Sequence, residues 1–322
     1  MTRAPTSEWG RRLSDALRAA LESDDLAHAR LLVLEGDGQA RNLAKEYTFM
    51  YRGLGITIQV LIRLLAGLPA GAGTAPMVRC FSDDLARLSL MKINPGEMRV
   101  LEESFAWFER EQARSADEIL RAIDATDCAR ALVLLDAKNS QYLQLHDRLV
   151  GFMAESFAWV LRHCGPAALL EFHLATAEGQ RAGFDKWERM PAAEFAWTSA
   201  FLLKQHMGQV SVREDAEKFT IEQTPCGSGG RLQINGAYTG QQALPFVEAP
   251  GPLTFGGPRL PVYCSHCPVW NGVAPLHWFG RAHWVFENAA RPDGSCTLHI
   301  YKKHEGTPPA YAERLSRPQG DG

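Results

Sequence analysis

The first two thirds of the chain place apolar residues three and four positions apart, which is the spacing of helices that bury one side. Some of these segments begin at capping residues, such as Ser23 and the Asn94-Pro95 pair. The last one ends at Gly208, a residue common just beyond a helix C-terminus. The predicted helices span residues 14–20, 23–34, 94–112, 115–123, 140–163, 165–180 and 190–208.

The tripeptide Phe-Ala-Trp occurs three times within these helices, at 105–107, 157–159 and 195–197, each time with a glutamate just upstream. The unequal spacings exclude a regular solenoid repeat. A di-iron helical bundle would show Glu-x-x-His pairs, and the sequence has none. We therefore interpret these aromatic residues as helix-packing residues.

Beyond the last predicted helix, apolar and polar residues alternate, which is the pattern of strands. Residues 217–226 form one such segment, and 282–288 with 295–303 form a hairpin around the turn sequence RPDGS. The glycine- and proline-rich sequence between them is predicted to be loop with short strands. The tail from residue 308 is predicted to be frayed.

The chain of 322 residues is long enough for two domains. The predicted fold class is α+β, because a run of helices precedes a run of antiparallel strands. A mainly α-helical domain would occupy residues 1–208, and a smaller Cys/His-rich α+β module with an antiparallel sheet would occupy 209–322.

Charge and hydropathy argue against several classes of function. The formal net charge of −3 and the lack of a basic run argue against a nucleic-acid partner. The most apolar stretch, 53–68, is interrupted by Gln59 and Arg63 and is shorter than the ~20 residues of a membrane span, so a buried helix is predicted there. The N-terminus has no apolar core of a signal peptide. We expect a cytoplasmic protein with no membrane partner.

Seven cysteines in a chain without an export signal favour free thiols or metal ligands over disulfides. The segment YCSHC places Cys264, His266 and Cys267 within four positions, and the two-residue spacing lets both sulfur atoms reach one ion. Cys226 would be the third ligand. His266 would be either the fourth ligand or a residue that contacts the ligands without binding the ion. Zinc and iron prefer thiolate and imidazole, so the sequence predicts one zinc or iron ion.

Two other interpretations of these cysteines stay open. They could pack as small apolar residues around a loop whose Gly-Ser-Gly-Gly run, 227–230, needs positive φ angles. Alternatively, Cys226 could be a catalytic nucleophile, because the same run could offer N–H groups as an oxyanion hole. His266 or His206 would then act as the base.

Catalysis would also need a proton carrier and groups that hold the substrate. Glu222 and Glu194 are the candidate proton carriers, and the sequence does not choose between them. Arg231 could bind a substrate carboxylate through two hydrogen bonds. Trp270 and Trp278 lie near the Cys/His segment and could form the wall of a pocket.

The order of the C-terminal segments is similar to that of a known family. A strand of the type FTIEQTPC is followed by a loop, a Pro-x-Tyr-Cys segment and a hairpin that ends in GSCTLHIY. Over residues 208–303 this resembles the L-2-amino-thiazoline-4-carboxylate hydrolase-like family, and more distantly the four-vinyl-reductase small-molecule-binding domain. The resemblance implies cysteines after the first strand, in the middle loop and at the start of the last strand. The matching positions are Cys226, Cys264 or Cys267, and Cys296.

Three functions follow as hypotheses. The first is a metal-dependent enzyme in which a metal-bound water hydrolyses a C–N or C–S bond of a small amide-like or heterocyclic molecule. The second is a non-catalytic small-molecule-binding or sensory protein, with a structural metal clip and helices that form a homodimer or a pocket. The third is a thiol enzyme that uses Cys226. Four protein ligands would indicate a structural ion, whereas three leave a position open for catalysis.

Overall fold

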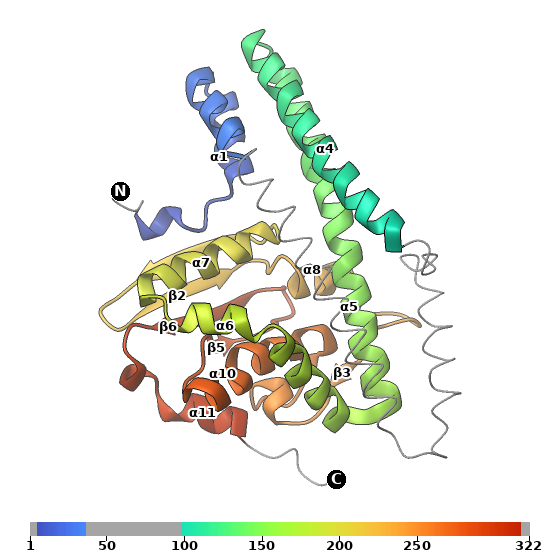
Figure 1. Ribbon diagram of the computed structural model, residues 1–322, viewed down its shortest axis with the longest axis vertical. Coiled ribbons are helices and arrows are strands. Elements are labelled where there is room, and N and C mark those ends of the chain that lie inside the picture. Colours follow the sequence, from blue (N-terminus) through green and yellow to red (C-terminus); the bar gives the residue numbers. More distant parts are fainter. Residues whose placement is uncertain (1–4, 37–97, 317–322) are drawn as a thin grey trace. The chain divides into compact units, whose positions relative to one another are not determined.

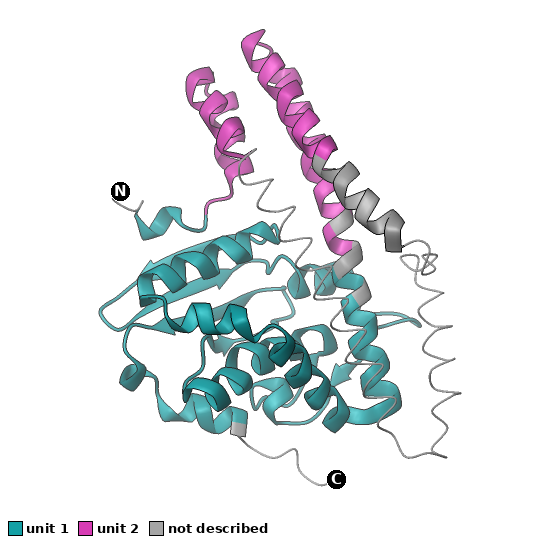
Figure 2. Cartoon of the chain, viewed as in Figure 1, with its two compact units in different colours: residues 1–10, 56–74, 150–322 teal, residues 11–55, 75–149 magenta. Residues whose placement is uncertain are grey.

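The computed structural model of the protein describes residues 5–36 and 98–316 (Figure 1). The chain divides into two compact units (Figure 2). Unit 1 comprises residues 1–10, 56–74 and 150–322, and unit 2 comprises residues 11–55 and 75–149. The sequence places a domain boundary at residue 208, where helix gives way to strand. The two units divide instead within the long helix α5, Cys128–Gly179.

The described part of unit 2 is helical. Its apolar core includes Leu21, Ile119 and Leu135, which are at most 3% exposed. At the edge of this core Arg18 forms an ion pair with Asp136. The helices of this unit are α1 (Leu13–Glu22), residues 26–36, α4 (Met98–Asp124) and the first part of α5. α4 joins residues that the sequence assigns to two separate helices.

Helix α5 contains a sharp break. Gly165 has a φ of 83° and a ψ of 175°, which lie outside the helical region. Pro166 follows, and its lack of an N–H group interrupts the helical hydrogen bonds. The break falls between the two helices predicted from the sequence, 140–163 and 165–180, and agrees with that prediction.

Unit 1 is built around a four-stranded antiparallel sheet in the order β1-β2-β6-β5. Ile221 lies opposite both Val212 and Leu298, and Gln223 lies opposite Cys296. The strands are β1 (Val210–Glu214), β2 (Lys218–Gln223), β5 (Val285–Asn288) and β6 (Cys296–Tyr301). A second sheet pairs β3 (Phe246–Val247) with β4 (Leu260–Pro261). The α+β fold class is therefore confirmed.

Helix α7 (Ala192–Gln205) covers one face of the four-stranded sheet (Figure 1). Successive side chains of a strand point to opposite faces, so Phe219 and Ile221 of β2 share the face that meets α7. Both are at most 1% exposed and belong to one apolar cluster with Ala196 of the helix. Trp9, just after η1 (Thr6–Glu8), stacks on Phe219 with ring centroids 5.7 Å apart. The N-terminal segment thus completes the core of unit 1.

The predicted hairpin is confirmed. β5 and β6 pair antiparallel, with Phe286 opposite Leu298, although both strands are shorter than the sequence predicts. Gly294 closes the turn with a φ of 77°, a conformation that favours glycine. The central strand from residues 217–226 is confirmed as β2, whereas β1 has no counterpart in the predictions.

The C-terminal module contains more helix than the sequence predicts. Pro275 lies in the first turn of α10, a position where proline starts helices rather than ending them. Helices replace predicted loop or frayed tail at α8 (Gly229–Ile234), η2 (Pro252–Thr254), η3 (Val262–Ser265), α9 (His266–Pro268), η4 (Val269–Val273), α10 (Ala274–Phe279), η5 (His304–Gly306) and α11 (Pro309–Ser316). Helix α6 (Arg181–Glu188) completes the unit.

The apolar segment 53–68, predicted as a buried helix, lies outside the described residues. Among the helices of residues 5–36 and 98–316, none combines the length and the apolar character needed to cross a bilayer.

Candidate functional site

Four cysteines from separate segments lie close together in unit 1, near enough for their charges to interact. We call Cys226, Cys264, Cys267 and Cys296 the cysteine cluster. Cys226 follows β2, Cys264 lies in η3, Cys267 lies in α9 and Cys296 begins β6. The sheet fixes one side of the cluster, because Gln223 pairs with Cys296 and the Cys226 N–H donates to the Gly294 carbonyl at 2.9 Å. All four are free thiols.

Two glycines of the Gly-Ser-Gly-Gly run allow the backbone to approach this cluster. A Cβ atom on Gly229 would lie 2.6 Å from the Cys264 sulfur, and one on Gly230 would lie 2.1 Å from the Gly294 carbonyl oxygen. Neither glycine has a positive φ angle. The prediction that this run needs positive φ angles is therefore wrong at both positions, and close packing is the reason for glycine.

Three thiols of the cluster, those of Cys264, Cys267 and Cys296, are held in their protonated form. Burial raises the pKa of Cys264 and of Cys267 well above the ordinary range, and the neighbouring thiols raise both further. Burial, followed by the effect of Cys226, raises the pKa of Cys296 to about 12. Low polarity disfavours a thiolate, and nearby thiolates disfavour it more. A cation among the sulfur atoms would reverse this balance, because coordinated thiols lose their protons.

His266 lies next to the cysteine cluster, and its contacts define which ring nitrogen carries the hydrogen. Its Nδ1 lies 2.5 Å from the Tyr263 carbonyl oxygen, which can only accept, so Nδ1 carries the hydrogen. Nε2 then holds a lone pair, 3.6 Å from the Cys267 sulfur. Burial lowers the pKa of His266 to about 4, with the Tyr263 carbonyl acting in the opposite direction, so the ring is neutral at pH 7. A neutral imidazole with a free Nε2 can bind a metal or accept a proton.

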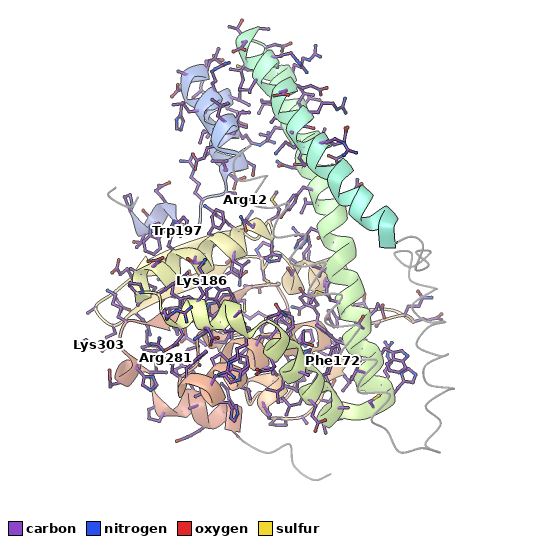
Figure 3. All side chains as sticks on the ribbon, viewed as in Figure 1. Arg12, Phe172, Lys186, Trp197, Arg281 and Lys303 are labelled. Atoms are coloured by element: carbon purple, nitrogen blue, oxygen red, sulfur yellow. The ribbon has the colours of Figure 1, made fainter. Side chains whose placement is uncertain are left out.

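A second buried histidine lies behind His266. The Ser265 hydroxyl donates to the Val262 carbonyl at 2.7 Å, so its oxygen accepts the Nε2 hydrogen of His173 at 2.9 Å. Nδ1 of His173 has no partner among the described residues. Burial, and then His266, lowers the pKa of His173 well below its ordinary value. Phe172, labelled on α5 in Figure 3, is fully buried beside it.

The donor set of the cysteine cluster suits zinc or iron, because it offers four thiols with His266 Nε2 beside them. Zn–S distances of about 2.3 Å would place the sulfur atoms roughly 3.8 Å apart. Within residues 5–36 and 98–316, no three His, Cys, Asp or Glu side chains stand at ligand spacing. Metal binding would therefore draw the thiols together and release their protons.

The other predicted polar residues are not gathered at the cluster. Glu222 points to the opposite face of the sheet from Gln223 and forms an ion pair with Arg213 at 2.6 Å. The Arg231 guanidinium donates to the His206 carbonyl at 2.8 Å, which ties α8 to the end of α7. Glu194 lies in the first turn of α7, at the other end of that helix.

Only one of the two predicted tryptophans lies beside the Cys/His segment. The ring of Trp270 is 4.7 Å from that of His266, and its indole N–H donates to the His173 carbonyl at 3.1 Å. Trp278 packs instead against Phe184, with ring centroids 5.4 Å apart.

Two members of this site were not assigned from the sequence as ligands or as catalytic groups. The sequence does contain an indication for Cys296, because this residue opens the last strand at a position that the family resemblance also marks. It contains none for His173, since a single histidine in an apolar helix has no distinguishing spacing.

No protein-family model matches the chain, and comparisons with curated proteins and with solved structures also give no match.

Proposed function

We propose that this protein binds one zinc or iron ion through Cys226, Cys264, Cys267 and Cys296. The observation that carries the proposal is the meeting of four free thiols from three separate parts of the chain. Thiolates this close together repel one another, and a bound cation would offset that repulsion and allow the thiols to lose their protons. A reducing compartment such as the cytoplasm would keep them free of disulfides.

Four thiolates fill the positions of a tetrahedral ion, which is the arrangement of a structural site. The ion would join the η3–α9 turn to β2 and β6, which already pair with each other in the sheet. The function that this geometry favours is a small-molecule-binding or sensory protein whose C-terminal module is held by a metal clip. The four thiolates would supply four negative charges to the ion. His266 would lie beside the ion as a neutral imidazole.

A second candidate is the metal-dependent hydrolysis of a C–N or C–S bond that the family resemblance implies. His266 supports it, because its unprotonated Nε2 lies 3.6 Å from the Cys267 sulfur and could accept a proton. The partial exposure of Cys226 also supports it, since a small substrate needs access to the site. In this case three thiols would bind the ion and one position would stay open.

Elemental analysis of protein purified without chelator tests the proposal. We expect about one equivalent of zinc or iron in the wild type, and much less in Cys264→Ser/Cys267→Ser and in Cys296→Ser. Cys164→Ser is the matched control, because Cys164 is a partly buried cysteine of α5 outside the cluster. Absence of metal in the wild type, even after incubation with excess Zn²⁺ or Fe²⁺ under reducing conditions, would overturn the proposal.

Replacement of the ion by Co²⁺ separates the two candidates. A closed site of four thiolates keeps its absorption spectrum when azide or cyanide is added, because no position is free. A shift of the spectrum on adding azide would indicate an open position and would favour the hydrolase.

A further inference from the structure

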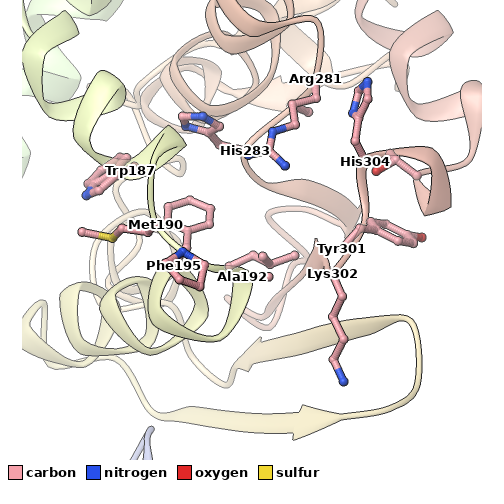
Figure 4. Close-up of a pocket in the computed structure, with 13 residues that line it drawn as sticks. Trp187, Met190, Ala192, Phe195, Arg281, His283, Tyr301, Lys302 and His304 are labelled. Carbon is pink, nitrogen blue, oxygen red and sulfur yellow. The ribbon is translucent and has the colours of Figure 1, made fainter.

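A cavity of about 240 Å³ lies in unit 1 between the start of α7, the segment before β5 and the end of β6 (Figure 4). Its size is below the roughly 300–1,000 Å³ of sites for drug-sized ligands, so it suits a small molecule. None of its lining residues belongs to the cysteine cluster. The cavity is therefore a separate candidate for a binding site.

One side of the cavity is apolar and aromatic. Trp187, Met190 and Phe195 lie together on this side, and Ala192 lies beside Phe195 (Figure 4). Trp187 and Phe195 are in contact, with ring centroids 5.9 Å apart. A flat apolar group placed here would be removed from water, which is favourable in proportion to its area.

The opposite side carries the positive charge of Arg281. His304 lines the same side, and no acidic residue is among the lining residues. Glu188 lies behind, where it holds the Arg281 guanidinium through Nη2 at 2.9 Å and Nε at 3.1 Å. Nη1 of Arg281 has no partner among the residues that the structure describes. Nη2 also donates to the Glu188 carbonyl oxygen at 3.5 Å, so the guanidinium is held in place and Nη1 is the nitrogen that can donate to a ligand.

The same carboxylate fixes His283. Nε2 of His283 lies 3.0 Å from Glu188, and the ring stacks on Phe279 at 5.3 Å with an interplanar angle of 6°. His283 is 5% exposed and forms part of the cavity wall. Arg281 and His283 are therefore both held in place before any ligand arrives, which lowers the entropy lost on binding.

The charges favour a monoanion over a dianion. Glu188 already offsets much of the charge of Arg281, and the ammonium of Lys302 pairs with Glu214 at 2.7 Å. Figure 4 shows Lys302 directed away from Arg281 and His304. The N–H groups of Arg281 Nη1 can donate to the oxygens of a carboxylate. A phosphate dianion would remain poorly compensated.

We propose that this cavity binds a small aromatic carboxylate, with the ring against Trp187, Met190 and Phe195 and the carboxylate on Arg281. The proposal does not depend on the metal proposed for the cysteine cluster. Its failure would leave the metal proposal unchanged, because the two sites share no residue and are measured separately.

Benzoate is the probe, titrated into the full-length protein and followed by ligand-observed NMR. We expect a dissociation constant near or below about 1 mM. Benzyl alcohol has the same ring without the charge, and acetate has the charge without the ring. Each should bind at least about ten-fold more weakly, since a hydrogen bond to a charged group and the burial of a ring each contribute that much.

Two variants test the location. Arg281→Gln removes the charged edge, and Ala192→Phe fills the cavity without altering its charge; each should weaken benzoate at least about ten-fold. The matched control is Arg291→Gln, since Arg291 is exposed in the β5–β6 turn away from the cavity lining. Arg281 also pairs with Glu188, so Arg281→Gln could unfold the protein. In that case Ala192→Phe still tests the location of the site.

Loss of benzoate binding in Ala192→Phe with retention in Arg291→Gln supports the proposal. No binding of benzoate at about 10 mM would overturn it. Equal affinity for benzyl alcohol, or for inorganic phosphate, would overturn the assignment to aromatic carboxylates. Benzoate binding that is unchanged in Ala192→Phe would place the ligand outside this cavity and would also overturn it.

Discussion

The Nε2 atom of His266 lies 3.6 Å from the sulfur of Cys267, with the opposite ring nitrogen fixed on a backbone carbonyl. The pKa of the imidazole is lowered to about 4 and the pKa of the thiol is raised well above its ordinary range, both chiefly through burial. The pair is therefore neutral, and the thiol donates to the imidazole. A thiolate–imidazolium pair, which cysteine hydrolases use, is not favoured here.

Alkylation by iodoacetamide measures this neutrality directly. Because the thiolate is the nucleophile, we expect Cys264, Cys267 and Cys296 in the native, metal-free protein at pH 7.5 to react more than about ten-fold more slowly than in the urea-unfolded protein. Peptide mass spectrometry at a series of times gives the rates. The unfolded protein is the control for differences in intrinsic reactivity.

Cys226 is the residue on which the thiol-enzyme hypothesis depends. Rapid and selective labelling of Cys226 in the native protein, at a rate above that of the unfolded chain, would identify an activated thiol at this position. That outcome would favour a nucleophilic cysteine over a metal ligand.

Gly229 is the point at which the backbone approaches the cluster most closely. We expect Gly229→Ala to destabilise the protein by about 1–3 kcal/mol, because the new Cβ would lie 2.6 Å from the Cys264 sulfur and overpack the site. The same substitution should reduce metal content. Urea unfolding gives the change in free energy of unfolding, and elemental analysis gives the metal.

Gly183→Ala is the matched control for that substitution. Gly183 lies in α6, its φ is not positive, and nothing lies within 4 Å of the position that a Cβ atom would take there. Alanine should stabilise a helix at this position by up to about 1 kcal/mol. Equal effects at positions 183 and 229 would contradict close packing as the reason for glycine at 229.

Local patterns predicted most of the elements that carry the fold. The periodicity of residues 190–208 indicated α7, and the alternation of 217–226 indicated β2, because both elements bury one face. The run of helices from Val262 to Phe279 was missed, since its prolines and glycine are as common in loops as in first turns of helices. β1 was missed because its five residues bury only Val212.

The two sites differ in how far the sequence could reveal them. Cysteine is rare and its spacing is informative, so Cys226, Cys264 and Cys267 were grouped before their geometry was known. The aromatic cavity could not be found in this way. Its parts, such as Phe195 and Arg281, are far apart in the chain, and each is an ordinary residue of its own segment. Only the pairing of β6 with its neighbours and the packing of α7 bring them together.

His299 makes stability depend on pH. It is 3% exposed on β6, and burial lowers its pKa, with Lys218 acting in the same direction and Glu287 opposing. The folded protein therefore holds His299 neutral, whereas the unfolded chain binds a proton as pH falls below about 6.5. The free energy of unfolding should fall with pH in this range. The contribution of His299 can reach about 1.4 kcal/mol per pH unit.

His299→Gln isolates this contribution, since an amide can still hydrogen-bond to Thr220 and Glu287, the present partners at 3.1 and 3.2 Å. The variant should show a shallower loss of stability between pH 6.5 and pH 5 in urea unfolding. His304→Gln is the control, because His304 is exposed. Parallel pH profiles for the wild type and His299→Gln would contradict the assignment.

Trp9 should contribute more to the stability of unit 1 than its place near the N-terminus suggests. It is 6% exposed and stacks on Phe219 of the central strand β2. Trp9→Ala should cost about 3–5 kcal/mol in urea unfolding, as expected for a buried large-to-small change. Trp197→Ala is the matched control, because Trp197 is 40% exposed on α7 and should cost about 1 kcal/mol or less. If the two variants are equally stable, Trp9 does not belong to the core and the N-terminal segment does not complete the sheet's apolar face.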